Sequence, residues 1–244
     1  MTPWTFLKTS LAALALTACA TAPVPASGGS DIALSPGVGW VANNPEWGAE
    51  AEKVYALASD YVEEIAATRE PNTWAVALDI DETVLNNVEY QIRREAVGGG
   101  FTPESWHAWT AEKAATLVPG AKPFLEKVNA LGGHIALVTN RSDTEQLWTE
   151  ENLAAVGLER NEDFRVLLTR ARPDGPSDKT ERYELVTAML AAQGYPGVEV
   201  VAYVGDNRKD RPEPINPDDK FFCINQGEMY GTPCAKLPAP VMAQ

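Results

Sequence analysis

Residues that many metal and nucleic-acid sites require are scarce in this chain. Its 244 residues include two histidines and three cysteines, so zinc and copper lack the ligands that they usually take. Basic residues are also few: 20 Lys and Arg stand against 34 Asp and Glu, which gives a net charge of −14. Because no basic cluster could neutralise a phosphate backbone, we exclude a nucleic-acid polymer as the partner.

The apolar run at residues 11–16 is too short to span a bilayer. It follows Lys8 and ends in Leu16-Thr17-Ala18-Cys19, which resembles the lipobox of bacterial lipoproteins. We therefore predict a lipoprotein signal peptide at residues 1–18 and a lipid on Cys19. Ala20 replaces the Asp that typically retains lipoproteins at the inner membrane, so we expect an outer-membrane anchor, facing the periplasm or the cell surface. A plain secretory signal, cut after Ala18, Ala20 or Ala22, is the alternative.

Residues 19–43 are predicted to be the lipidated Cys and a flexible tether, because residues 21–30 are rich in Pro, Ala, Gly and Ser. The folded domain is predicted at residues 44–244. Export also makes a disulfide between Cys223 and Cys234 plausible, and such a short loop would stabilise the fold by roughly 3 kcal/mol. Two free cysteines are the alternative.

Two aspartates mark the abrupt end of an apolar run of strand length. Residues 74–78 precede Asp79, and Asp81 and Thr83 follow at once. Both carboxylates therefore fall at the carboxyl end of a buried strand, where open α/β sheets build their sites. Two like charges this close raise at least one pKa unless a cation intervenes. A structural role, in which Asp and Thr cap the turn, is the alternative.

Strands and helices alternate along the rest of the domain. A helix starts at Asn44-Pro45-Glu46, and later helices are expected to be capped by Ser142 and Ser177. Further apolar runs of strand length lie at 134–140, 166–169, 198–204 and 221–225. This pattern predicts an α/β fold, with a three-layer Rossmann-like parallel sheet.

A mostly polar insertion at about 86–119 is predicted to form a small helical cap. Trp106 and Trp109 lie one helical turn apart within it. Such a pair usually fills a core, and stacking of one of them on a substrate is the alternative.

Polar residues follow the buried strands and converge on one crevice, because parallel strands end at the same edge of a sheet. They are Asp79, Asp81, Thr139, Asn140, Asp206 and Asp210, with Lys179 near the start of a helix. Several carboxylates and one Lys suit a hard cation that prefers oxygen ligands. Mg²⁺ fits best, since it binds through a few carboxylates, waters and substrate phosphate.

Four motifs carry a resemblance to a known family. They are Asp-Ile-Asp-Glu-Thr at 79–83, Thr-Asn at 139–140, Lys179, and Gly-Asp-x-x-x-Asp at 205–210. Together they resemble the haloacid dehalogenase superfamily. Lys179-x-x-Arg182 and Asn225-Gln226-Gly227 are similar to its class C bacterial acid phosphatases, the lipoprotein 5′-nucleotidases of the outer membrane. The resemblance spans roughly residues 40–238.

The resemblance implies a Mg²⁺-dependent acid phosphatase that acts on phosphate monoesters such as nucleoside 5′-monophosphates. Asp79 would be the nucleophile that forms an aspartyl-phosphate, and Asp81 the general acid and base, protonated when substrate binds. The Asp79 carboxylate, the Asp81 carbonyl and Asp206 would hold Mg²⁺. Asp210 would be a ligand or would orient a metal-bound water.

Substrate contacts are expected from a second group of residues. Thr139 and Asn140 would bind phosphoryl oxygens, and Lys179 would neutralise their charge. Trp106 and Tyr230 are expected to flank a nucleobase or aromatic leaving group.

The chain departs from the family at the fourth motif, where Arg208-Lys209 makes the rim more basic and predicts an altered substrate preference.

A dehalogenase, a phosphonatase and a non-catalytic lipoprotein that binds through the same fold are the rival functions. A dehalogenase has no use for a general acid at Asp81. A phosphonatase needs an additional lysine that forms a Schiff base, and the sequence pattern identifies no lysine for that role. A binding module would be expected to have lost a catalytic residue. The physiological substrate, the pH optimum and whether the domain forms a homodimer stay open.

Overall fold

Five parallel strands form the central sheet of this computed structural model, which describes Met1 and residues 33–172, 174–214, 216 and 218–227. Their spatial order is β5-β4-β1-β6-β7, so the first strand of the sheet lies at its centre. The strands are β1 (Trp74–Leu78), β4 (His134–Ser142), β5 (Val166–Arg170), β6 (Glu199–Gly205) and β7 (Phe221–Cys223). The predicted α/β class is confirmed.

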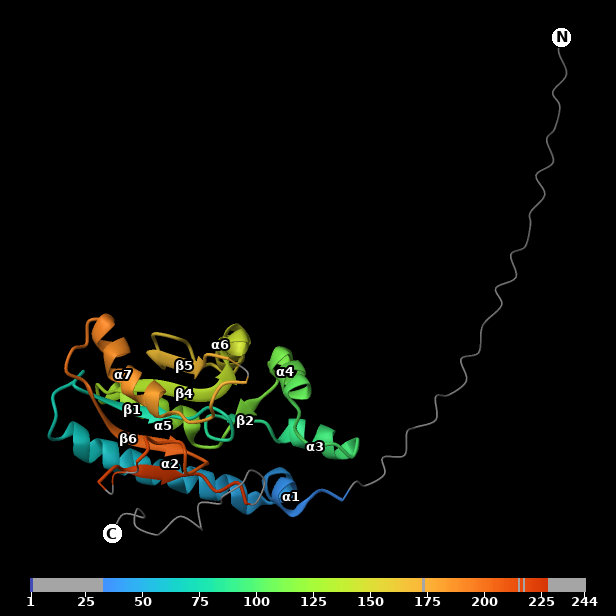
Figure 1. Cartoon of the computed structure of the whole chain (residues 1–244), viewed down its shortest axis with the longest axis horizontal. Helices are drawn as coiled ribbons and strands as arrows, with labels where there is room; N and C mark the ends of the chain where they lie inside the picture. Colours follow the sequence, from blue (N-terminus) through green and yellow to red (C-terminus); the bar gives the residue numbers. More distant parts are fainter. Residues whose placement is uncertain (2–32, 173, 215, 217, 228–244) are drawn as a thin grey trace. The chain divides into compact units, whose positions relative to one another are not determined.

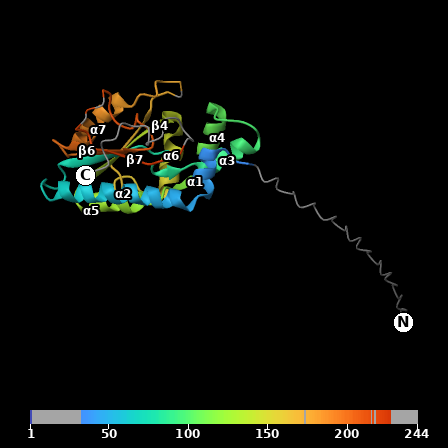
Figure 2. The same ribbon diagram turned by 90° about the horizontal axis from the view of Figure 1, so that it is seen from below.

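Helices cover both faces of the sheet, as Figures 1 and 2 show. One face is covered by α2 and α5, which lie side by side, and the other by α7. The helices of the core are α2 (Pro45–Ala66), α5 (Ala121–Ala130), α6 (Gln146–Ala155, after the 3-10 turn Asp143–Glu145) and α7 (Thr180–Ala192). The result is the three-layer arrangement that the sequence predicts.

Side chains of β1 alternate between the two layers. Trp74, Val76 and Leu78 point into the larger core beneath α2 and α5. Ala75 and Ala77 point to the smaller core beneath α7. All five are fully buried, which explains why this strand reads as a continuous apolar run and not as an alternating one.

The insertion between β1 and α5 contains two helices and a short antiparallel ribbon. The ribbon pairs β2 (Leu85–Asn86) with β3 (Thr116–Leu117), and the helices are α3 (Val88–Ala96) and α4 (Pro103–Glu112). A capping box between Thr102 and Ser105 starts α4. Figure 1 shows α3 and α4 beside β2, at one end of the sheet.

Two sequence predictions about boundaries are wrong. The folded part does not begin at residue 44, because residues 36–43 form helix α1 (Pro36–Asn43) and bury Val38 and Val41. Ser177 does not cap α7, which begins at Thr180 after Lys179. Instead, the Ser177 carbonyl accepts a hydrogen bond from Asn140 at 3.1 Å.

Several predictions concern residues that the structure does not describe. The signal peptide at 1–18, Cys19 and most of the tether fall there, as do Tyr230 and Cys234. Cys223 is disulfide-bonded at the end of β7, and its pairing with Cys234 stays a prediction. Within the described ranges, no helix combines the length and apolar character needed to cross a membrane.

Candidate active site

Asp79 and Asp81 lie in a tight turn at the carboxyl end of β1. The Asp79 amide donates to the Val204 carbonyl at 3.0 Å, which continues the β1–β6 ladder by one residue. Glu82 then adopts a left-handed backbone with φ of 60°, and the Ile80 carbonyl accepts the amides of Val84 and Leu85. This turn stops the strand and leaves both carboxylates at the edge of the sheet.

Lys179 connects two of the predicted aspartates. Its Nζ lies 2.5 Å from Asp79 Oδ1 and 2.6 Å from Asp210 Oδ1, and its side chain is 2% exposed. Burial disfavours the charge on Lys179, but Asp210 and Asp79 outweigh that penalty and raise its pKa. Lys179 is therefore a fixed cation inside the site.

An acidic cluster surrounds this lysine. Asp79, Asp206 and Asp210 each bring a carboxylate oxygen within 4.8 Å of the others. Burial raises the pKa of Asp79 to about 7; Lys179 opposes the rise, and Asp210 and Asp81 add to it. Burial, followed by repulsion from Asp210 and Asp79, also raises the pKa of Asp206.

These carboxylates fit a divalent cation. A cation between Asp79 and Asp206 would relieve the burial and repulsion that raise both pKa values. Asp210 is less suited to direct contact, because Lys179 occupies its Oδ1 and the Asn207 amide donates to its Oδ2 at 2.7 Å. Asp210 is instead placed to orient Lys179 and the groups that would surround the ion.

Thr139 and Asn140 lie at the carboxyl edge of the sheet on β4, the neighbour of β1. The Thr139 hydroxyl oxygen accepts the Arg141 amide at 3.1 Å, which leaves its hydrogen free to point elsewhere. Arg182 from α7 donates to the Thr139 carbonyl and to Asn140 Oδ1. These contacts fix the end of β4 against α7, and one hydrogen of the Asn140 amide stays available beyond its bond to Ser177.

Two residues that contact Asp81 are not assigned a role in the site by the sequence pattern. Arg141 pairs with Asp81, with Nη2 at 2.7 Å from Oδ1, and Asn87 donates to the same oxygen at 3.0 Å. Arg141 stands directly after the Thr-Asn motif and could have been suspected for that reason. Its partner is 60 residues earlier in the chain, and only the folded structure reveals the pairing.

A cavity of about 760 Å³ opens beside Asp81, between α4 and the end of β4. Phe101, Trp106 and His107 line its cap side, and Arg141 and Arg170 are among the residues of its core side. The predicted Trp106 thus faces the site, whereas Trp109 is buried, as expected of a residue that fills a core.

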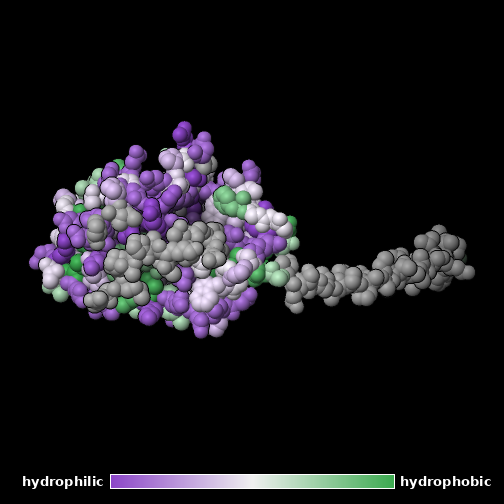
Figure 3. Space-filling model, turned by 60° about the horizontal axis from the view of Figure 1, so that its bottom comes forward, coloured by the Kyte–Doolittle hydropathy of each residue, from purple (hydrophilic) through white to green (hydrophobic). Residues whose placement is uncertain are grey.

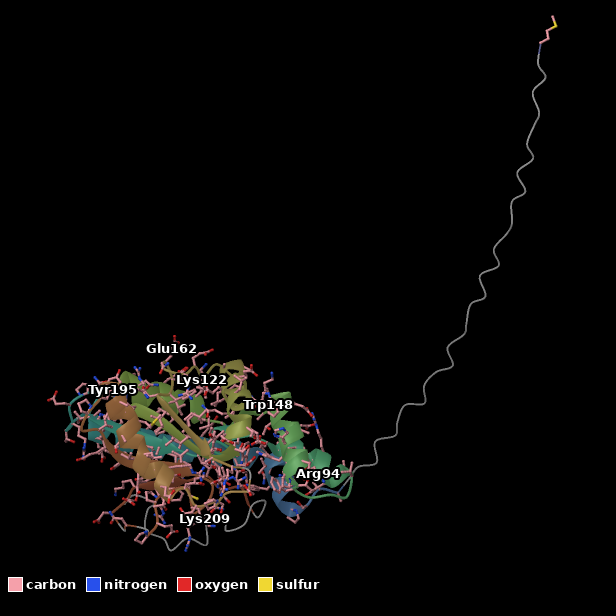
Figure 4. All side chains as sticks on the ribbon, turned by 45° about the horizontal axis from the view of Figure 1, so that its top comes forward. Arg94, Lys122, Trp148, Glu162, Tyr195 and Lys209 are labelled. Atoms are coloured by element: carbon pink, nitrogen blue, oxygen red, sulfur yellow. The ribbon has the colours of Figure 1, made fainter. Side chains whose placement is uncertain are left out.

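His107 links the cap with the core beside this cavity. Its Nδ1 lies 3.3 Å from Glu145 Oε1. Its ring centre also lies 4.7 Å from that of Trp148 of α6, with the two rings tilted by 58°, and Figure 4 labels Trp148 at the side of the core near the cap helices.

Comparison with known proteins agrees with this fold and gives a family. Residues 36–233 match the family described as HAD superfamily, subfamily IIIB (Acid phosphatase). The class C acid phosphatase from Bacillus anthracis has a similar structure, with a TM-score of 0.66 and 24% sequence identity over 80% of this chain and 84% of that one. The same enzyme with tungstate bound matches with a TM-score of 0.66 and 23% identity over the same shares of the two chains.

Proposed function

Because the chain belongs to subfamily IIIB of the HAD superfamily and is therefore an acid phosphatase, we propose that it transfers the phosphoryl group to Asp79. The observation that carries this proposal is the pairing of Asp79 with Lys179 inside a buried acidic cluster. A carboxylate attacks phosphorus well when it is held at a strand end and when nearby cations reduce the repulsion between two anions. Asp79 meets both conditions.

The first step breaks the ester bond. An Asp79 oxygen attacks phosphorus, the bond from phosphorus to the ester oxygen breaks, and Asp81 gives its proton to the departing oxygen. In the second step, water attacks the aspartyl-phosphate and loses a proton to Asp81, and Asp79 leaves. Asp81 lies on the cavity side of the turn, where a leaving group would sit.

The charge that builds on the phosphoryl oxygens is met by residues of two elements. Lys179 precedes α7, and Thr139 and Asn140 lie in the last part of β4. Mg²⁺ would be held by Asp79, Asp206 and the Asp81 carbonyl, and when bound it supplies positive charge to the transferring group. Asp210 keeps Lys179 in place, as its 2.6 Å contact supports.

Nucleoside 5′-monophosphates are the proposed substrates. A cavity of about 760 Å³ has room for a nucleoside, and Trp106 and Phe101 offer aromatic faces to a base. Tyr230 is proposed as a further flanking residue. The enzyme is also proposed to be exported and attached to the outer membrane through a lipid on Cys19, as the lipobox indicates.

Phosphate release by the purified protein tests this function. The assay uses p-nitrophenyl phosphate and a nucleoside 5′-monophosphate, with Mg²⁺ or with EDTA, beside an Asp79→Asn variant. We expect turnover that requires Mg²⁺ and is lost in the variant. A folded protein that binds Mg²⁺ but releases no phosphate from either ester would instead indicate a binding module, and full activity of Asp79→Asn would exclude Asp79 as the nucleophile.

A further inference from the structure

The two carboxylate oxygens of Asp81 have unequal surroundings. Oδ1 accepts hydrogen bonds from Arg141 Nη2 at 2.7 Å, from Arg141 Nε at 2.9 Å and from Asn87 Nδ2 at 3.0 Å. Oδ2 has one longer contact, with Arg141 Nε at 3.2 Å. One oxygen is thus saturated with donors, and the other keeps room for a proton.

Arg141 is itself held in one position. Its side chain is fully buried, and it also donates to Thr149 Oγ1 at 3.4 Å and to Asn87 Oδ1 at 3.3 Å. Its guanidinium carbon lies 5.7 Å from the centre of the Trp106 ring, on the cap. The guanidinium of Arg141 is planar and held by these other partners, so it loses little conformational freedom when it binds the Asp81 carboxylate.

Asn87 connects this arrangement to the cap. It is buried at the start of the insertion, and its Oδ1 accepts the indole hydrogen of Trp109 at 2.8 Å. Its Nδ2 is therefore turned toward Asp81 and also reaches the Leu85 carbonyl at 3.3 Å. The orientation of the Asp81 carboxyl depends on β4 on one side and on the cap helix α4 on the other.

We propose that Arg141, assisted by Asn87, is a positioning residue that fixes Asp81 Oδ1 and presents Oδ2 as the oxygen that transfers protons. The proposal rests on the proposed role of Asp81 as general acid and base. In the first step the proton on Oδ2 passes to the ester oxygen as its bond to phosphorus breaks. In the second step Oδ2 takes a proton from the attacking water as phosphorus separates from Asp79, which restores the starting state.

The dependence of the rate on the leaving group distinguishes this role from a structural one. A good leaving group, such as p-nitrophenolate, departs with little help from an acid, whereas an alkoxide needs the proton. Misplacing Oδ2 should therefore harm alkyl esters much more than p-nitrophenyl phosphate. Loss of packing or of phosphate binding should harm both equally.

The experiment compares Arg141→Lys with wild type on p-nitrophenyl phosphate, phenyl phosphate and an alkyl phosphate, all with Mg²⁺. The matched control is Arg160→Lys, because Arg160 also binds a carboxylate with two nitrogens, at 2.6 and 3.1 Å from Glu150, and does not line the cavity. Asn87→Ala serves as a second variant that removes one donor to Oδ1 and keeps Arg141. Thermal unfolding of each variant shows that the compared proteins are folded.

We expect Arg141→Lys to lower kcat/KM on the alkyl ester by about 100-fold or more, and on p-nitrophenyl phosphate by less than about tenfold. Phenyl phosphate should fall between them. Asn87→Ala should show the same order with smaller losses, and Arg160→Lys should stay near wild type on all three esters.

Equal losses on all three esters in folded Arg141→Lys, or no loss, would overturn the proposal. If Arg141→Lys does not fold, Asn87→Ala decides by the same criterion. Asp81→Asn separates this failure from failure of the proposed function. If Asp81→Asn loses no more activity on the alkyl ester than on p-nitrophenyl phosphate, Asp81 is not the general acid. The proposed positioning of its oxygens is then excluded together with that role.

Discussion

At the scale of single residues, the charge balance of the site depends on Lys179. Its ammonium group is buried between Asp79 and Asp210, in a place where water solvates charged groups poorly. A buried pair of this kind adds little net stability, yet removal of one partner is costly. Lys179 therefore has a structural role and a catalytic one in the same position.

We predict that Lys179→Met lowers the free energy of unfolding by about 3–5 kcal/mol in EDTA, because two buried carboxylates lose their cation. Phosphatase activity should be lost as well. Urea denaturation measures the first effect. The control is Lys127→Met: Lys127 pairs with Glu63 where both side chains are about half exposed, at 41% and 51%, and its loss should cost less than about 1 kcal/mol. Equal costs for the two variants would contradict the account.

His134 makes stability depend on pH in the acid range. It is buried at the start of β4, with its ring 4.3 Å from that of Tyr195. Burial, with repulsion from Arg165, lowers the pKa of His134 below its ordinary value of 6.5. The unfolded chain therefore binds a proton at this residue at a pH where the folded protein does not, so stability falls as the pH drops below the ordinary value.

We predict that His134→Phe, which keeps a ring against Tyr195, removes the part of the stability loss in acid that His134 causes. As the pH is lowered from about 7 to about 5, the free energy of unfolding should decrease less for the variant than for wild type. Denaturation at several pH values measures the difference. A difference that stays constant over this range would contradict the lowered pKa.

At the scale of elements, the end of β6 brings Asp206 and Asp210 to the site. Gly205 ends this strand, and its Cα lies so close to the Asp210 side chain that an added methyl group would overlap the Asp210 carboxylate. A glycine is needed here for close approach rather than for an unusual φ. The loop from β6 folds back over the strand end only because this position has no side chain.

We predict that Gly205→Ala lowers kcat/KM by about 100-fold, since Asp210 must move and take Lys179 with it. Steady-state kinetics with p-nitrophenyl phosphate measure the loss. Gly100→Ala is the control, because a methyl group there meets nothing within 4 Å, and its activity should match wild type. Unchanged activity of Gly205→Ala would show that the position of Asp210 is not critical.

Elements with a strong local pattern could be predicted from the sequence, and weakly patterned ones could not. The buried runs 74–78 and 134–140 are strands of the sheet, as expected. Helix α1 is not evident from the sequence because Gly37 and Gly39 lower its intrinsic propensity, and because its burial depends on contacts with α3, which lies about 50 residues later, as well as with the adjacent α2. The start of α7 lies later than the sequence indicates because the Ser177 carbonyl bonds to Asn140 of β4, and the helix begins only at Thr180.

The residues of the site also fall into a group that the sequence pattern predicts and a group that it does not. Asp79, Asp206 and Asp210 come together because strand order and strand ends place them, and these follow from the sequence pattern. The pairing of Arg141 and Asn87 with Asp81 depends on side-chain directions across the cap and the core, which no local pattern encodes.

At the scale of the whole molecule, a net charge of −14 opposes an anionic substrate. The face seen in Figure 3 is largely hydrophilic, in keeping with the excess of acidic residues. Attraction must be local, from Lys179 and a few arginines at the site. The long-range field therefore slows the approach of a phosphate monoester.

We predict that kcat/KM for a nucleoside monophosphate rises, by less than about tenfold, when salt shortens the screening length from about 30 Å to about 8 Å. Kinetics at increasing ionic strength with fixed Mg²⁺ measure this. A double Arg208→Glu, Lys209→Glu variant should show a steeper rise, because both cations lie in the loop after β6; Figure 4 labels Lys209 there. A fall in kcat/KM with salt would indicate net attraction and contradict the prediction.

Trapping the covalent intermediate tests the central claim most directly. Asp81→Asn should be phosphorylated by p-nitrophenyl phosphate but hydrolyse the intermediate slowly, because it lacks the base for the second step. Acid quenching followed by mass spectrometry of peptides locates the phosphoryl group. We predict phosphorylation of Asp79, and none in a double Asp79→Asn, Asp81→Asn variant. Phosphorylation of another residue, or turnover by wild type with no covalent intermediate in either protein, would contradict the account.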